Sequence, residues 1–219
     1  MRRLALALAA CGATAVAAAP SWPDTPLARV EALALLQTLN ADLLSQPSAT
    51  LTLERWCGAH RLAASPRVLA LRDRDAHKPL PDDLRRALGI GPQTPVRYRR
   101  VRLACGGRVL SEADNWYLPG RLTAAMNRQL DGSDTPFGKV VRPLRFSRHT
   151  LSARLLWSPL PDGWEMRGVP AAGPQPLALP HQLLQHRAVL ADARGRPFSA
   201  LVETYTAQVL AFPPPGARP

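Results

Sequence analysis

Apolar residues recur at helical spacing in the first part of the chain. Between positions 25 and 46 they return every three or four residues, which predicts an amphipathic helix with Asp24 or Thr25 available as its cap. A second, shorter helix is expected over 52–62, after Pro47. Two further short helices are expected over 82–88 and 121–130. The first two helices are expected to cover a sheet.

Alternation of side chains at every second residue predicts strands in the rest of the chain. Residues 96–105 form one such stretch, Gly106 and Gly107 supply a turn, and 109–117 returns as the antiparallel partner. The remaining strands are predicted over 140–156, as strand, bend and strand, and over 186–191 and 198–207, as a hairpin, with an irregular connection over 159–180. We expect an α+β fold with a single antiparallel β-sheet and helices packed on it.

Arginines lie on both faces of the first strand of the central hairpin. Tyr98, Arg100 and Arg102 fall on one side, and Arg97 and Arg99 on the other. A guanidinium is costly to bury without an anionic partner. Each arginine therefore either lies in solvent or meets a carboxylate, which the protein or a ligand supplies.

The N-terminal stretch is typical of a bacterial export signal. Arg2 and Arg3 precede a run of leucine and alanine that ends in three alanines before Pro20. We expect a periplasmic or secreted protein. An alternative is a lipoprotein, because the residues before Cys11 resemble a lipidation motif, and only then is a membrane partner expected. The predicted organisation is a signal peptide over 1–19, one domain over 20–211 and a flexible, proline-rich tail over 212–219.

Export changes the interpretation of the cysteines. Once Cys11 is removed with the signal, Cys57 and Cys105 remain, and an oxidising compartment permits a disulfide between them. Two residues alone do not specify the geometry, so the bridged and free forms both stay open. No spacing of cysteine and histidine is typical of a metal site, so no metal is expected.

Length and charge limit the classes of function. The chain has 219 residues, 46% of them hydrophobic, which suits one domain with a hydrophobic core. Its net charge of +12 favours an anionic partner, although a GC-rich coding sequence explains the arginines equally well. Because only 5% of residues are aromatic and no basic cluster is interleaved with them, no nucleic-acid partner is expected. The anionic partners that remain are phospholipid headgroups and a small acidic ligand.

The common enzyme motifs are absent from the sequence. It contains no nucleophile elbow, P-loop, dinucleotide fingerprint or HExxH zinc motif. The charged run around Asp73, Asp75 and His77 is interpreted as a solvated loop rather than a metal site. The residues that remain as candidates for chemistry are Arg100, Glu203 and the turn at 135–138.

Four places in the chain carry a family resemblance. They are Ser48-Ala49-Thr50, Arg100 five residues before Cys105, the turn Thr135-Pro136-Phe137-Gly138 followed by Thr150-Leu151, and Gly195-Arg196-Pro197 leading to Glu203. In order and spacing they resemble the chorismate lyase family. The resemblance implies that family's α+β fold. It also implies conversion of chorismate to 4-hydroxybenzoate and pyruvate, in ubiquinone biosynthesis, by a carbon–oxygen lyase without a cofactor.

The resemblance assigns roles to individual residues. Arg100 is implied to bind the ring carboxylate and to serve catalysis, and Glu203 is implied to protonate the leaving oxygen. The backbone around Ala49, Phe137 and Gly138 is implied to bind the ligand. Asn115 stands where the family has an arginine, which departs from the pattern.

Export also departs from the pattern, because chorismate is made in the cytoplasm. One alternative is an exported, non-catalytic binding or accessory protein for an aromatic carboxylate on the same fold. Another is an envelope protein whose pocket has filled, with Arg100 and Glu203 paired to each other. We expect a monomer, and neither the natural ligand nor retention of lyase activity follows from the sequence.

Overall fold

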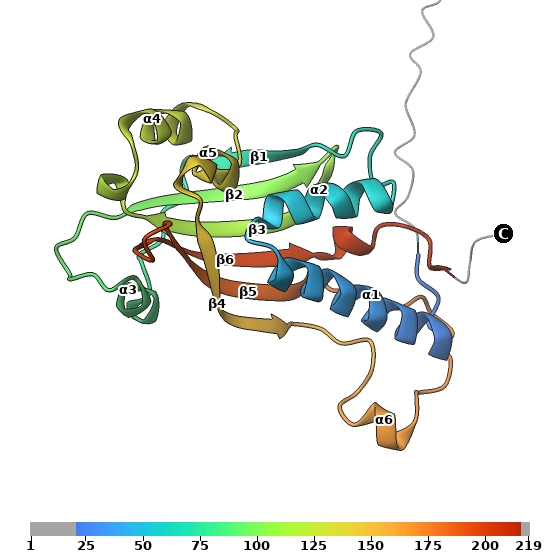
Figure 1. The fold of residues 1–219 in the computed structure, drawn as a ribbon. Coiled ribbons are helices and arrows are strands. Elements are labelled where there is room, and N and C mark those ends of the chain that lie inside the picture. The colour runs from blue at the N-terminus through green and yellow to red at the C-terminus, as the bar shows by residue number, and fades with distance from the viewer. Residues whose placement is uncertain (1–20, 216–219) are drawn as a thin grey trace, which may run out of the picture.

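The computed structural model describes residues 21–215, and its centre is one antiparallel β-sheet (Figure 1). The predicted signal peptide, Cys11 and the last four residues lie outside this range. Six strands follow the order β1-β2-β3-β6-β5-β4. They are β1 (Val68–Asp73), β2 (Arg97–Cys105), β3 (Arg108–Tyr117), β4 (Ser147–Leu155), β5 (Gln182–Ala191) and β6 (Pro197–Thr206). The expected α+β class with a single antiparallel sheet is confirmed.

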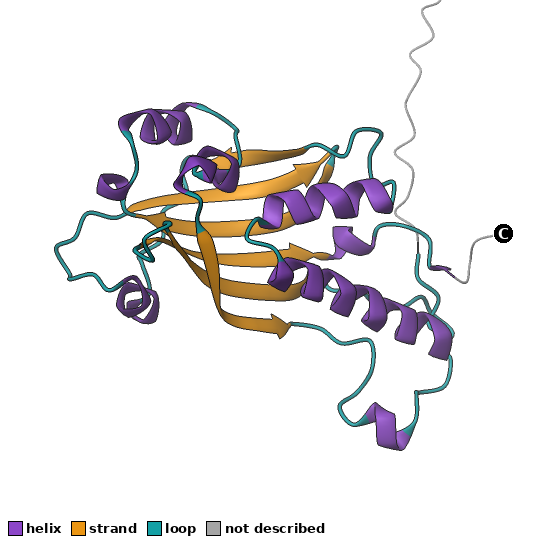
Figure 2. Ribbon diagram, viewed as in Figure 1, coloured by secondary structure: helices purple, strands orange, loops and turns teal. Residues whose placement is uncertain are grey.

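Helices cover the sheet unequally. Two long helices, α1 (Pro26–Ser45) and α2 (Ala49–Ala59), cross one face side by side (Figure 2). The shorter helices are α3 (Asp82–Leu88), α4 (Ala124–Gly132), α5 (Phe137–Val140) and α6 (Trp164–Arg167), with 3-10 turns η1 (Pro119–Arg121), η2 (Arg142–Leu144) and η3 (Ala207–Leu210). No helix among residues 21–215 is long and apolar enough to cross a membrane.

The first helix forms as its pattern predicts. Thr25 caps α1 by accepting a hydrogen bond from the backbone of Ala28 at 3.2 Å, and Pro26 occupies the first turn, where its missing N–H costs nothing. One stripe of the helix is buried against the sheet: Ala28, Ala32, Leu36, Leu39 and Leu43. This stripe joins residues of α2, β2, β3 and β6 in the main hydrophobic core.

The central hairpin also has the predicted arrangement. β2 and β3 pair antiparallel, and Gly106 in the turn has φ of 58°, a left-handed conformation that glycine adopts without strain. Alternation along β2 places Arg99 and Val101 on the face covered by α1 and α2, and Arg100 on the opposite face. On that opposite face α3 contributes Leu84 and Leu88 to a second core around Trp116.

Two stretches differ most from the sequence expectation. Residues 140–156 contain the last residue of α5, the turn η2 and the single strand β4, rather than two strands around a bend. The strand β1 was missed, because the charged run that follows it led to the interpretation of this region as a loop. Its backbone completes the edge of the sheet beside β2. Tertiary pairing, which the local pattern does not encode, decided both cases.

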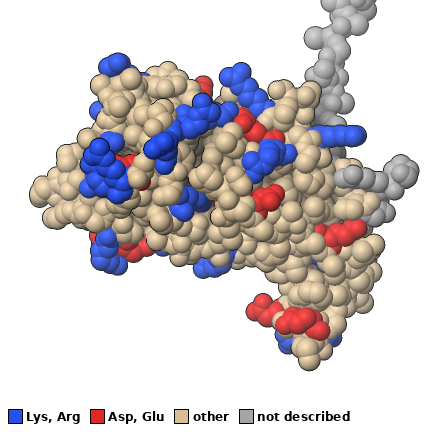
Figure 3. Space-filling model, viewed as in Figure 1, with Lys and Arg blue, Asp and Glu red and all other residues tan. Residues whose placement is uncertain are grey.

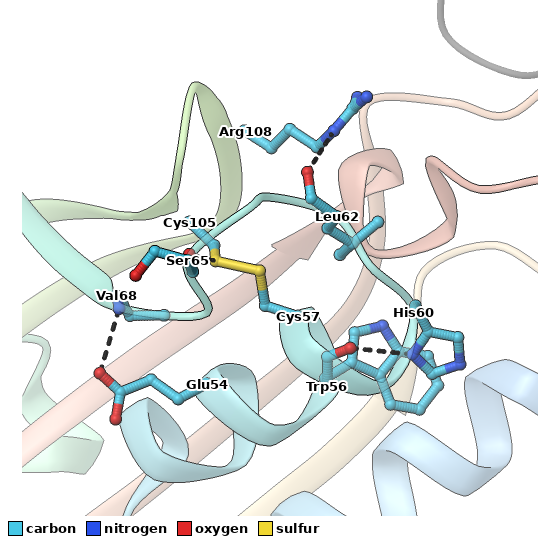
Figure 4. The surroundings of a disulfide bond; sticks show 9 residues. All are labelled: Glu54, Trp56, Cys57, His60, Leu62, Ser65, Val68, Cys105 and Arg108. Atoms are coloured by element: carbon cyan, nitrogen blue, oxygen red, sulfur yellow. Dashed lines mark hydrogen bonds between the residues drawn. A yellow bond between two sulfur atoms is a disulfide. The ribbon is translucent and has the colours of Figure 1, made fainter.

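A disulfide joins the helical layer to the sheet. Cys57 of α2 bonds to Cys105 at the end of β2, so the bridged form is the one that the structure contains (Figure 4). Close by, the Glu54 carboxylate accepts a hydrogen bond from the Val68 backbone at 3.0 Å, which ties α2 to β1 as well. These links fix the position of α2 over the sheet.

Candidate functional site

A small cavity lies between the sheet and the first residues of α2 and α5. Its floor is formed by the helix-covered face of β2, β3, β6 and β5, and one side by the start of β4. The cavity has a volume of about 50 Å³. Most of its lining is apolar, and the charged side chains that face it are Arg99, Arg148 and Glu203.

Arg99 is the unusual residue of this cavity. Its side chain is buried, with the residue only 2% exposed. Nη2 donates to the backbone oxygens of Ser133 and Thr135, at 3.3 and 3.2 Å. The atoms Nε and Nη1 are buried without a hydrogen-bond partner among the described residues. Burial, followed by the nearby charge of Arg72, lowers the pKa of Arg99 to about 10, so a positive charge is held here at a free-energy cost.

Two helix starts face the same cavity. Ser48 caps α2, where its hydroxyl accepts from the Leu51 amide and its carbonyl from the Thr52 amide. Among the residues described, the amides of Ala49 and Thr50 have no such partner. At the start of α5, a Cβ added to Gly138 would lie 3.4 Å from the Ser48 hydroxyl, so glycine allows the two helix starts to approach closely.

A buried ion pair forms another part of the wall. Arg148 Nη2 lies 2.7 Å from Glu203 Oε2, and the two side chains are 4% and 9% exposed. The Tyr205 hydroxyl donates to the same carboxylate oxygen at 3.2 Å. Burial raises the pKa of Tyr205 well above its ordinary value, so this group remains a donor. Arg148 Nε is buried without a partner among the described residues.

Behind the ion pair lies a buried histidine. His186 is opposite Glu203 in the pairing of β5 with β6, and its Nε2 lies 2.8 Å from the Asn40 amide oxygen of α1. Burial, and then the charge of Arg148, lowers the pKa of His186 to about 4. The imidazole is therefore neutral near pH 7, and it adds no charge to the cavity.

Arg100 lies outside the cavity, contrary to its sequence-based assignment. On the opposite face its Nη1 donates to Asp114 at 3.0 Å, and that carboxylate also accepts from Lys78 and Tyr98. These donors lower the pKa of Asp114 below its ordinary value, although burial acts in the other direction. Side chains alternate along a strand, so a shift of one residue exchanges the two faces.

The other predicted residues surround the cavity. Ala49, Phe137, Gly138 and Glu203 all line it, and their roles toward a ligand stay predictions. The suggested pairing of Arg100 with Glu203 is wrong, because the two side chains lie on opposite faces and Glu203 pairs with Arg148.

Sequence reasoning missed Arg99 and Arg148 as residues of the cavity. Strand alternation did separate Arg99 from Arg100, but it could not say which face the helices cover. Nothing local marked Arg148, which reaches Glu203 across the intervening strand β5.

Comparison with known proteins identifies a relative. No family model matches the chain. Over 196 residues it is 57% identical to the uncharacterized protein y4mC of Sinorhizobium fredii, covering 89% of this chain and 83% of that protein. The chain belongs to the y4mC family.

Solved structures similar to this y4mC-family chain are more distant. They include a possible transcriptional regulator, YydK, from Bacillus subtilis, with 18% identity and a TM-score of 0.37 over 63% of this chain and 58% of that one. The ligand-binding domain of a GntR-family regulator from Bordetella bronchiseptica has 18% identity and a TM-score of 0.41, covering 64% and 82%. PhnF from Mycobacterium smegmatis has 14% identity and a TM-score of 0.45, covering 74% and 64%.

These findings correct the expected function. The similar structures include transcriptional regulators and a ligand-binding domain, and none of the proteins named above is described as a lyase. The expectation of chorismate lyase activity in ubiquinone biosynthesis is therefore wrong. The comparisons also give no support to the expectation that nucleic acid is not a partner.

The expected alternative, a binding protein for an aromatic carboxylate, does not fit the cavity. An engineered apolar cavity that binds benzene measures about 150 Å³, three times the volume of about 50 Å³ found here.

Charged side chains are spread over the surface. On the face shown in Figure 3, lysine and arginine side chains are distributed over several elements, with acidic groups between them. The charges that distinguish the cavity are instead inside it.

Proposed function

We propose that this chain is a binding protein for a small oxyanion, which Arg99 holds in the cavity. The observation that carries the proposal is the burial of Arg99 with two unpaired nitrogens. A buried guanidinium without an anion is costly, and a carboxylate, sulfonate or phosphate offers the two oxygens that its fork accepts.

The start of α2 supports the same chemistry. Its free amides at Ala49 and Thr50 belong to residues that line the cavity, and the positive end of a helix dipole favours an anion. Arg99 indicates the same chemistry, because its side chain lines the same cavity and carries two nitrogens without a partner among residues 21–215. An anion placed there gains a charged donor and neutral donors together.

The cavity volume sets the size of the ligand. One water-sized group needs about 10–15 Å³ by this measure, so a cavity of about 50 Å³ holds a group of roughly three to five non-hydrogen atoms. Acetate, methanesulfonate and phosphate are of this size. No histidine, cysteine or lysine of residues 21–215 lines the cavity, and its one carboxylate, Glu203, is paired with Arg148, which favours binding over acid–base or nucleophilic catalysis.

Calorimetric titration of the purified protein tests this proposal. The probes are acetate and methanesulfonate, in a Tris-chloride buffer of low ionic strength. Arg99→Gln should weaken binding by about tenfold or more, because a charge-assisted hydrogen bond contributes roughly 1.5–3 kcal/mol. The matched control is Arg102→Gln, which removes the same charge from an exposed position on the same strand.

The outcomes are distinct. Binding lost in Arg99→Gln and kept in Arg102→Gln supports the proposal. Equal affinity in the wild type and Arg99→Gln, or no binding of any probe by the wild type, contradicts it.

A further inference from the structure

The charged side chains that line the cavity determine which ligand charge it can balance. Two arginines and one glutamate line it, so their formal sum is one positive charge. Arg148 and Glu203 lie 2.7 Å apart and neutralise each other. The remaining charge is that of Arg99, whose Nε and Nη1 have no partner in the described part of the chain.

The Arg148–Glu203 pair joins two strands that are not neighbours in the sheet. Arg148 comes from the edge strand β4 and Glu203 from β6, with β5 between them. Tyr205 adds a second donor to the carboxylate, and the neutral His186 lies directly behind it. Both charges of the pair are nearly excluded from water, so solvent screens them little.

The ionisable groups just outside the cavity do not alter this count. Lys139 of α5 and Glu54 of α2 are paired at 2.7 Å. Tyr205 is neutral because its pKa is raised. Near Arg99, the negative charge of Asp134 opposes the positive charges of Arg72 and Arg74, and none of these three residues lines the cavity.

Resting on the proposed function, we infer that the Arg148–Glu203 pair makes the cavity selective for a monoanion over a dianion of the same size. One negative charge on the ligand balances Arg99. A second would leave an uncompensated negative charge beside the Glu203 carboxylate in a medium of low dielectric constant, where like charges repel strongly. Glu203 thus acts as a specificity residue rather than as a proton donor.

Methanesulfonate and sulfate are the matched probes for this inference. Both are tetrahedral sulfur oxyanions with five non-hydrogen atoms, but they carry one and two charges. The measured quantity is the ratio of the two dissociation constants, determined by calorimetry for each variant. Comparing this ratio between variants cancels the different hydration of the two ions, because hydration of the free ion is the same in every titration.

Glu203→Gln should shift this ratio toward sulfate by at least tenfold, because the cavity then carries two positive charges. Glu112→Gln is the control, since it removes one carboxylate from the opposite face of the sheet and should leave the ratio unchanged.

Glu203→Gln leaves Arg148 buried without its partner, which destabilises the folded protein. A double variant removes this unpaired charge. Glu203→Gln with Arg148→Gln restores a single positive charge and permits an amide–amide hydrogen bond, so its ratio should return to the wild-type value. If Glu203→Gln does not fold, Arg148→Gln decides: it leaves the Glu203 charge unbalanced, so a ratio shifted away from sulfate supports the inference, and an unchanged ratio overturns it.

The remaining outcomes separate the two proposals. An unchanged ratio in a folded Glu203→Gln variant overturns the selectivity while leaving oxyanion binding intact. If the wild-type protein binds neither probe, the proposed function fails and the selectivity fails with it.

Discussion

Arg99 shows how one side chain can be unfavourable for folding and useful for binding. Its buried guanidinium keeps two nitrogens unpaired, and an unsatisfied buried polar group costs about 1–3 kcal/mol. Such strain is retained where a ligand relieves it, and residues of this kind concentrate at functional sites. The neighbouring Arg100, which is satisfied by Asp114, lacks this property.

Replacing Arg99 with methionine should therefore stabilise the ligand-free protein. The long apolar side chain fills a similar volume and removes the buried charge, so we expect the free energy of unfolding to rise by about 1 kcal/mol. Urea denaturation followed by circular dichroism measures this change. A fall of similar size would show that the hydrogen bonds from Nη2 to Ser133 and Thr135 outweigh the cost of burial.

At the scale of elements, His186 connects α1 to the sheet through Asn40. Its pKa is about 4 in the folded protein, below the ordinary value of 6.5. Between these values the unfolded chain binds a proton that the folded protein does not. The contribution of His186 to the free energy of unfolding is therefore fully present above about pH 6.5, and it is lost as the pH falls toward 4.

His186→Gln tests this pH dependence, because glutamine keeps a donor for Asn40 but does not titrate. Relative to that variant, the wild-type protein should lose about 2 kcal/mol of unfolding free energy between pH 6.5 and 4. The measurement is chemical denaturation at several pH values. Parallel stability curves for the two proteins would show that His186 is not the titrating group.

For the molecule as a whole, the disulfide is the strongest single constraint on the chain. Cys57 and Cys105 are 48 residues apart, and the segment they close includes β1, α3 and most of β2. Closing a loop of this length lowers the entropy of the unfolded chain, which stabilises the folded protein by about 4 kcal/mol in the chain-entropy model. The bond also suits the exported location that the N-terminal pattern predicts, which itself stays a prediction.

Replacing both cysteines with serine should lower the free energy of unfolding by about this amount. Denaturation of the variant, and of the wild type with and without a thiol reductant, measures it. Reductant should have no effect on the variant, which serves as the control. A wild-type protein that is equally stable with and without reductant would rule out this role of the bond.

Local pattern determined much of the fold. The apolar spacing around α1, the glycine turn of the central hairpin and the alternation in β6 are each specified by residues close together in the chain, so these elements could be predicted. The family resemblance, rather than this pattern, implied that an arginine on β2 and a carboxylate on β6 belong to the site. It also implied a role for the start of α2 and the 135–138 turn.

Only the tertiary structure decided which arginine faces the cavity. The two faces of β2 carry similar side chains, and the choice between Arg99 and Arg100 depends on where α1 and α2 pack, which residues far along the chain determine. The pairing of Arg148 with Glu203 likewise joins strands that are not neighbours in the sheet. Burial and pairing of charge are properties of the assembled fold, and they are what gives this cavity its chemistry.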